Sequence, residues 1–188
     1  MLTPLLLAAF IAAGGKTVTV PEYEVQEKVT LEASKTALII VDMQNDFANP
    51  KGSLYVPSTK EVIPNIKRLL DRARKAGVFI VFTQDWHPKD DPEFKIWPIH
   101  AVRGTWGSKI IKELKPRKEE EQVHKLRYDA FYGTSLDHIL RLHGIENVIV
   151  TGTVSNICVL HTVGSAALRW YKVIVPVSYT HLRAHETR

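Results

Sequence analysis

The chain has 188 residues, of which 45% are hydrophobic and 24% charged, and its net charge is +5 at pH 7. This length suits one packed domain, and the composition is that of a globular protein. Basic residues are interleaved with acidic ones, as in "KRLLDRARK", so we expect solvated helix faces and no nucleic-acid partner. Cys158 is the only cysteine, which excludes an internal disulfide framework and favours a reducing, cytoplasmic location.

The N-terminus contains the apolar stretch "LLLAAFIAAGG", which no Lys or Arg precedes. It is too short to span a bilayer, so we expect no membrane partner. We interpret residues 1–35 as an N-terminal extension whose apolar part forms a short helix, packed on the domain or on another subunit of a homo-oligomer. A secretion signal is the alternative.

From residue 36 onward, short β-branched runs alternate with longer amphipathic stretches. Strands are predicted at 36–41, 78–83, 121–126, 147–152 and 172–177. Helices are predicted at 61–76, 108–115, 134–143 and 156–171, with Gly77 and Gly144 as C-caps. Nearly continuous apolar strands alternating with helices predict a single α/β domain over 36–177: a parallel sheet with helices on both faces, in a Rossmann-type three-layer arrangement.

Polar residues gather where these strands end. Asp42 follows the first strand in "DMQNDF", Asp85 and His87 follow the second, Lys125 lies near the end of the third, and Cys158 comes just after the fourth. An Asp at this position commonly closes a strand in a turn. However, ligands of parallel α/β sheets bind outside the carboxyl ends of the strands, so the coincidence favours a functional site.

The segment "TGTVSNICV" predicts a tight strand-to-helix turn with Cys158 in the first helical turn. Free N–H groups and the helix dipole there favour a thiolate and can hold an oxyanion. Asp42 could take the thiol proton and pass it to a leaving nitrogen, and Lys125 could steady the negative charges. The alternatives are a buried structural cysteine and a solvated lysine. We interpret His161, one helical turn further on, as structural.

The long loop from Gln84 to Gly107 carries "DWH" and "WPIH". Asp85, His87 and His100 form a candidate site for one divalent metal ion, Zn first and Fe or Mn next, and Glu93 could be a fourth ligand. Loop histidines without a metal are the alternative. His138 and His143 are expected on helix surfaces, and His124 should face away from its neighbour Lys125.

Five motifs in order, "IIVDMQNDF", "TQDWHP", "WPIHAVRGT", "KLRYDAFYGT" and "TGTVSNICVLHT", resemble the isochorismatase-like cysteine hydrolases, and among them the nicotinamidases. The resemblance covers residues 36–177. It implies that Asp42, Lys125 and Cys158 form a catalytic triad and that Asp85, His87 and His100 bind the metal. Glu93 matches an acidic ligand of some members only.

The resemblance also implies a cis peptide between Thr153 and Val154, an oxyanion hole made by the backbone N–H groups of Val154 and Cys158, and a pyridine pocket walled by Phe47 and Trp97. The implied activity is conversion of nicotinamide to nicotinate and ammonia through a thioester, as in NAD salvage.

Two features depart from the nicotinamidase pattern. The motif "TGTVSNICV" is closer to that of cysteine hydrolases in general. Another small amide, a ureido compound or isochorismate is therefore an alternative substrate. The non-enzyme alternative is a catalytically silent scaffold. The segment "SYTHLRAHETR" (178–188) is unlike the family, so we expect a C-terminally truncated domain followed by a non-native tail, in which His181 and His185 have no function.

Overall fold

The computed structural model describes residues 25–177. Residues from Leu31 onward form one compact unit. The apolar stretch at the N-terminus and the segment 178–188 lie outside the described residues. Within 25–177, no helix has the length and apolar character needed to cross a membrane.

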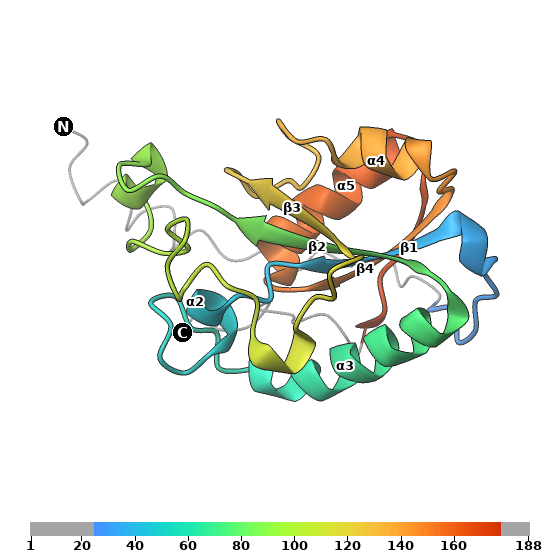
Figure 1. The fold of residues 1–188 in the computed structure, drawn as a ribbon, viewed down its shortest axis with the longest axis horizontal. Coiled ribbons are helices and arrows are strands. Elements are labelled where there is room, and N and C mark those ends of the chain that lie inside the picture. Colours follow the sequence, from blue (N-terminus) through green and yellow to red (C-terminus); the bar gives the residue numbers. More distant parts are fainter. Residues whose placement is uncertain (1–24, 178–188) are drawn as a thin grey trace, which may run out of the picture. The chain divides into compact units, whose positions relative to one another are not determined.

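A five-stranded sheet runs through this unit (Figure 1). Its strands are β1 (Thr36–Val41), β2 (Phe79–Asp85), β3 (Glu121–Lys125), β4 (Asn147–Gly152) and β5 (Lys172–Ile174). They lie in the order β3-β2-β1-β4-β5, and every neighbouring pair is parallel. The predicted α/β fold class is therefore confirmed.

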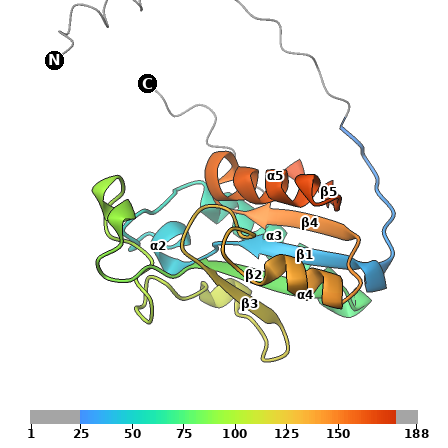
Figure 2. The ribbon, with the colours of Figure 1, turned by 90° about the horizontal axis from the view of Figure 1, so that it is seen from above.

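Helices cover both faces of the sheet (Figures 1 and 2). On one face, α3 (Thr59–Ala76) packs Ile66 and Leu70 against Leu38 and Ile40 of β1. On the other, α4 (Leu136–Leu142) and α5 (Leu160–Leu168) cover the alternate β1 residues. Because successive strand residues point to opposite faces, a strand buried on both sides is apolar throughout, and all six residues of β1 are buried.

Shorter helical segments connect these elements. They are α2 (Asn45–Ala48), the 3₁₀ turns η1 (Ala33–Lys35), η2 (Pro92–Lys95) and η3 (Lys112–Leu114), and the π-helical turn η4 (Ser155–Val159). Gly77 ends α3 with a φ of 74°, as predicted, and Gly144, with a φ of 64°, directly follows the C-cap of α4. A left-handed φ is accessible to glycine at little cost.

The predicted helix at 108–115 is wrong. Its backbone pairs instead with the chain after β1: Asn45 N donates to Lys109 O at 2.9 Å, and Ile111 N donates to Met43 O at 3.0 Å. Only the 3₁₀ turn η3 remains before Pro116. The last predicted helix is also divided, because η4 occupies its first residues and α5 begins at Leu160.

Candidate active site

Three charged side chains meet where β1, β2 and β3 end. The register aligns Asp85 with Lys125, while Asp42 follows β1 directly. Lys125 Nζ lies 2.7 Å from Asp42 Oδ2 and 2.5 Å from Asp85 Oδ1, and none of the three side chains is more than 4% exposed. Thr83 Oγ1 donates to Asp42 Oδ1 at 2.7 Å. Asp42 has a positive φ of 50°, which Asp tolerates better than most residues, so a strained turn aims its carboxyl into the site.

One ammonium group thus faces two buried carboxylates. Burial alone would lower the pKa of Lys125, but Asp42 and Asp85 outweigh it and hold that pKa well above its ordinary value. Burial also opposes ionisation of Asp85, yet Lys125 and His87 lower its pKa to about 2. For Asp42, burial prevails over Lys125 and raises the pKa to about 6. Because a single cation cannot fully compensate both anions, Asp42 is poised to exchange a proton near neutral pH.

Cys158 joins this group from the turn after β4. A side chain at Gly152 would place its Cβ 2.1 Å from Val41 O, so only glycine lets the end of β4 approach β1 this closely. The Thr153–Val154 peptide is cis, as expected, and Cys158 sits in the π turn η4, 7% exposed. Ligand atoms of Asp42, Asp85 and Cys158 lie within 4.8 Å of one another.

The surroundings of Cys158 oppose the thiolate that was expected from its place at a helix N-terminus. Burial raises the pKa of the Cys158 thiol well above its ordinary value, and Asp42 and Asp85 add to the effect, whereas Lys125 opposes it. The prediction from the helix N-terminus was wrong in sign because it ignored desolvation and the two carboxylates. The nucleophile must therefore lose its proton to a neighbour, and Asp42 is beside it.

A second cluster adjoins the triad at Asp85. Ligand atoms of Asp85, His87 and His100 lie within 4.8 Å of one another, and all three residues are buried. His87 Nε2 has no hydrogen-bond partner and lies 3.9 Å from Asp85 Oδ2. A buried imidazole nitrogen without a partner is costly, and a metal ion is the ligand that two imidazoles and a carboxylate suit. These residues fit a divalent metal.

The outer nitrogens of both histidines are held in place. His87 Nδ1 donates to Asp91 Oδ2 at 3.0 Å, and His100 Nδ1 donates to Pro98 O at 2.7 Å. With the protons on Nδ1, both Nε2 lone pairs remain for a metal, as in many metal sites. Glu93 is also buried. Its carboxylate lies close to His87 and Asp91, and 3.5 Å from Arg127.

Side chains of the "DMQNDF" stretch fix the loop that carries this cluster. Gln44 is fully buried, donates to Asp85 O and Ser108 O, and accepts from Asp85 N, all at 2.8 Å. Asp46 Oδ2 accepts from Ala101 N at 2.7 Å, next to His100. At Gly107, an added Cβ would lie 2.0 Å from the same carboxylate oxygen. Asp42 therefore serves the triad, whereas Gln44 and Asp46 position the loop.

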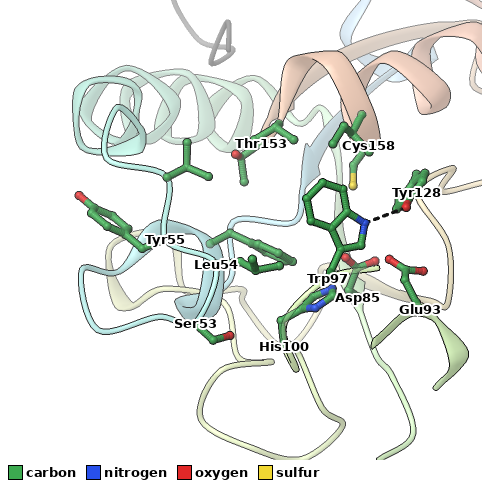
Figure 3. Close-up of a pocket in the computed structure, with 14 residues that line it drawn as sticks. Ser53, Leu54, Tyr55, Asp85, Glu93, Trp97, His100, Tyr128, Thr153 and Cys158 are labelled. Atoms are coloured by element: carbon green, nitrogen blue, oxygen red, sulfur yellow. Dashed lines mark hydrogen bonds between the residues drawn. The ribbon is translucent and has the colours of Figure 1, made fainter. Parts of the chain in front are cut away.

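Cys158 of the triad and Asp85 and His100 of the metal cluster line one cavity of about 220 Å³ (Figure 3). Its walls include Phe47, Trp97, Tyr128, Val154 and Ile157, and Asp85, His100, Glu93 and Cys158 line it as well. The Trp97 indole N–H donates to Tyr128 Oη at 2.9 Å, so two loops hold this wall together. The cavity is narrow, mostly apolar and polar at defined points, as small-molecule sites are.

Comparison with known proteins agrees with this geometry. Residues 36–183 match the isochorismatase domain. The chain belongs to the isochorismatase family. It is 31% identical to a ureidoacrylate amidohydrolase from Rhizobium rhizogenes, over 94% of this chain and 85% of that protein.

Solved structures of the same family superpose well on this chain. N-carbamoylsarcosine amidase from Thermoplasma acidophilum is 36% identical, with a TM-score of 0.76 over 81% of this chain and 87% of that chain. A pyrazinamidase from Pyrococcus horikoshii in complex with zinc is 30% identical, with a TM-score of 0.74 over 78% of this chain and 86% of that chain. The predicted family is confirmed, and the chain is an isochorismatase-family hydrolase. The family match also includes the first residues of the segment 178–188.

The predicted positions of His124, His138 and His143 agree with the structure, whereas His181 and His185 lie outside the described residues. His124 is exposed and stacks on Trp86, with ring centroids 4.0 Å apart, while Lys125 is buried. His138 and His143 are exposed, and His161 Nδ1 bonds to Ile157 O at 2.7 Å. Sequence reasoning missed Gln44, Asp46 and Asp91 because their partners are backbone groups or side chains that only the folded loop brings near.

Proposed function

We propose that this isochorismatase-family hydrolase is a metal-dependent cysteine amidohydrolase that converts nicotinamide to nicotinate and ammonia. The observation that carries the proposal is the unpartnered His87 Nε2, buried beside Asp85 and His100, two residues that line the same cavity as Cys158. A nucleophile and a metal-ligand set that share one small cavity suit a substrate with a carboxamide at one end and a ligating nitrogen at the other.

Asp85, His87 and His100 would hold the metal, with Glu93 as a candidate further ligand. A divalent metal ion bound there, zinc first, would supply a Lewis acid that fixes the ring nitrogen and so orients the substrate. The apolar walls formed by Phe47 and Trp97 suit a flat pyridine ring.

The first half-reaction starts from the neutral Cys158 thiol and the ionised Asp42 carboxylate. As the Asp42 carboxylate accepts the thiol proton, Cys158 Sγ bonds to the carboxamide carbon and the carbonyl π electrons move to oxygen. Backbone N–H groups of Val154 and Cys158 would hold this oxyanion. Asp42 then gives its proton to the nitrogen, the C–N bond breaks, and ammonia leaves a thioester.

In the second half-reaction, Asp42 accepts a proton from water, whose oxygen attacks the thioester carbon. The C–S bond breaks, the sulfur regains a proton, and the carboxylic acid is released. Lys125 stays protonated throughout, because its pKa is held well above its ordinary value, and it keeps Asp85 ionised.

The test is an ammonia-release assay with nicotinamide, before and after removal of metal with a chelator and after restoration of Zn, Fe or Mn. We expect turnover that is lost on chelation and recovered with metal. Equal turnover of nicotinamide and benzamide, which lacks the ring nitrogen, would contradict the role given to the metal, since a site built for a polar atom discriminates strongly against its absence.

A second candidate is hydrolysis of a ureido compound. It is supported by the similarity to a ureidoacrylate amidohydrolase and to N-carbamoylsarcosine amidase. Ammonia release from an N-carbamoyl amino acid, with no turnover of nicotinamide, would favour this candidate. Activity towards isochorismate without a metal would favour the vinyl-ether chemistry considered from the sequence.

A further inference from the structure

Trp97 lines the catalytic cavity, yet it stands on an exposed part of the long loop. The indole side chain belongs to a half-buried residue, whereas the two residues on each side of it are exposed. Its backbone N–H donates to Glu93 O at 3.0 Å, which is a bond within the same loop. A side chain on such a segment needs a contact from another element to keep one orientation.

Tyr128 supplies that contact. The Trp97 indole N–H donates to Tyr128 Oη at 2.9 Å, and the two residues are 31 positions apart in the sequence (Figure 3). An indole nitrogen is a donor only, so this is the one conventional hydrogen bond that it can make. Tyr128 also lines the cavity and packs against buried residues of the core. The bond therefore joins a wall on an exposed segment to a side chain anchored in the core.

The loop that carries Tyr128 is held in turn by α5. Ala130 N donates to Thr162 Oγ1 at 3.1 Å. Ser165 Oγ donates to Asp129 Oδ2 at 2.5 Å. The helix α5 continues directly from the turn η4, which contains the nucleophile. The orientation of the indole is thus set, through Tyr128, by the helix that follows the nucleophile turn.

We propose that Tyr128 is a positioning residue for substrate recognition, whose phenol holds the Trp97 indole as a flat wall beside Cys158. This inference rests on the proposed amidohydrolase function and deepens it, because a fixed flat wall favours a planar aromatic ring over a flexible ureido chain. Without the phenol oxygen, the partly buried indole N–H would lose its acceptor, which is costly. The exposed segment around Trp97 would then let the indole turn towards water.

The first experiment measures the wall without any substrate. Acrylamide quenching of tryptophan fluorescence is compared between the unmodified protein and Trp97→Phe, so that the difference gives the contribution of Trp97. The same difference is then taken with Tyr128→Phe present in both proteins. We expect Trp97 to be quenched more readily in Tyr128→Phe, because the indole turns towards solvent.

Tyr132→Phe is the matched control for quenching. It removes the hydroxyl of a tyrosine in the same loop that is 68% exposed, and it should leave the quenching of Trp97 unchanged. Quenching of Trp97 that is equal with and without the Tyr128 hydroxyl would overturn the inference.

The second experiment measures KM and kcat for nicotinamide with the metal-loaded protein. Tyr128→Phe should raise KM about fivefold, as expected for one lost hydrogen bond, and should change kcat little because the thiol and its base stay in place. In the Trp97→Phe background the same substitution should have no effect, since the bond is already absent. An equal rise in KM in both backgrounds, or none in the unmodified one, would overturn the role of Tyr128 and leave the proposed function intact.

An N-carbamoyl amino acid separates the two hypotheses. Its flexible chain gains little from a flat wall, so Tyr128→Phe should leave its KM nearly unchanged. A similar rise in KM for this compound and for nicotinamide would overturn the role in specificity. If nicotinamide is not hydrolysed, the proposed function fails. The quenching of Trp97 then decides alone: a rise in Tyr128→Phe supports the positioning role, and no change overturns it.

Discussion

The triad adjoins the metal cluster at Asp85, which pairs with Lys125, yet the two are built in different ways. Asp42 follows β1 and Lys125 ends β3, on either side of β2, and the parallel register brings these strand ends to one edge of the sheet. His87 and His100 are carried by a long loop, and side-chain bonds to backbone hold that loop: Asp46 to Ala101 N, and Gln44 to Asp85 and Ser108. Strand ends are thus placed by the core, whereas the loop depends on a few polar anchors.

This difference has an energetic side. At the triad, burial raises the pKa of Asp42, Asp85 adds to this effect, and Lys125 opposes it. The strand ends hold these three charged side chains in contact. The cluster leaves His87 Nε2 without a partner, so it would gain most from a ligand. Variants in the triad should abolish chemistry or destabilise the fold, whereas variants in the cluster should reduce ligand binding first.

The largest effect is expected at the nucleophile. Cys158→Ala should lower kcat by roughly 10⁴-fold or more, since removal of a nucleophile eliminates the covalent route. The substrate should still bind, because the cavity and metal ligands remain, and calorimetry with the variant can measure this. Turnover equal to that of the unmodified protein would exclude a thioester intermediate.

Lys125→Met should be the most destabilising change in the triad. It leaves Asp42 and Asp85 buried without their cation, and breaking a buried ion pair costs about 3–5 kcal/mol. Denaturant unfolding measures this loss. The control is Lys67→Met in the exposed pair with Asp71, where a loss below about 1 kcal/mol is expected. Similar losses in both variants would contradict the special burial of the triad.

In the metal cluster, His87→Ala should greatly lower the metal content and substrate affinity of the folded protein. Asp91→Asn, which weakens the bond to His87 Nδ1, should lower metal affinity by about 10–100-fold. Iodoacetamide should still label Cys158 in both variants, because the nucleophile is held by other elements. Loss of labelling in a folded variant would mean that triad and cluster are not separable.

The acid limb of the pH profile of kcat/KM should reflect the ionisation of Asp42. Its raised pKa of about 6 predicts that kcat/KM falls as pH decreases through 6, approaching tenfold per pH unit, because a protonated carboxyl cannot accept the thiol proton. Stability should respond in the opposite direction: the folded state binds this proton more tightly than the unfolded chain, so ionisation of Asp42 destabilises the fold between about pH 4 and 6. A kcat/KM that stays constant down to pH 5 would exclude Asp42 as the base.

Much of the site could be predicted from where its residues stand in the sequence. Asp42, Asp85, Lys125 and Cys158 follow apolar runs, and parallel strands bring such positions to one edge. The helix at 108–115 could not be excluded, because its backbone bonds go to residues 43–45, which are more than sixty positions away. The direction of the Cys158 pKa shift could not be predicted from the sequence either, since it depends on burial and on two carboxylates from other strands.

Local sequence patterns were enough to predict the α/β sheet, the order of its polar strand ends and the family, because apolar periodicity and motifs are properties of neighbouring residues. The folded structure was needed to show which "DMQNDF" side chain lies at the triad, which ones anchor a loop, and which histidine nitrogen is left unpaired. These depend on distances between segments remote in sequence and on desolvation, which exists only once the chain has folded.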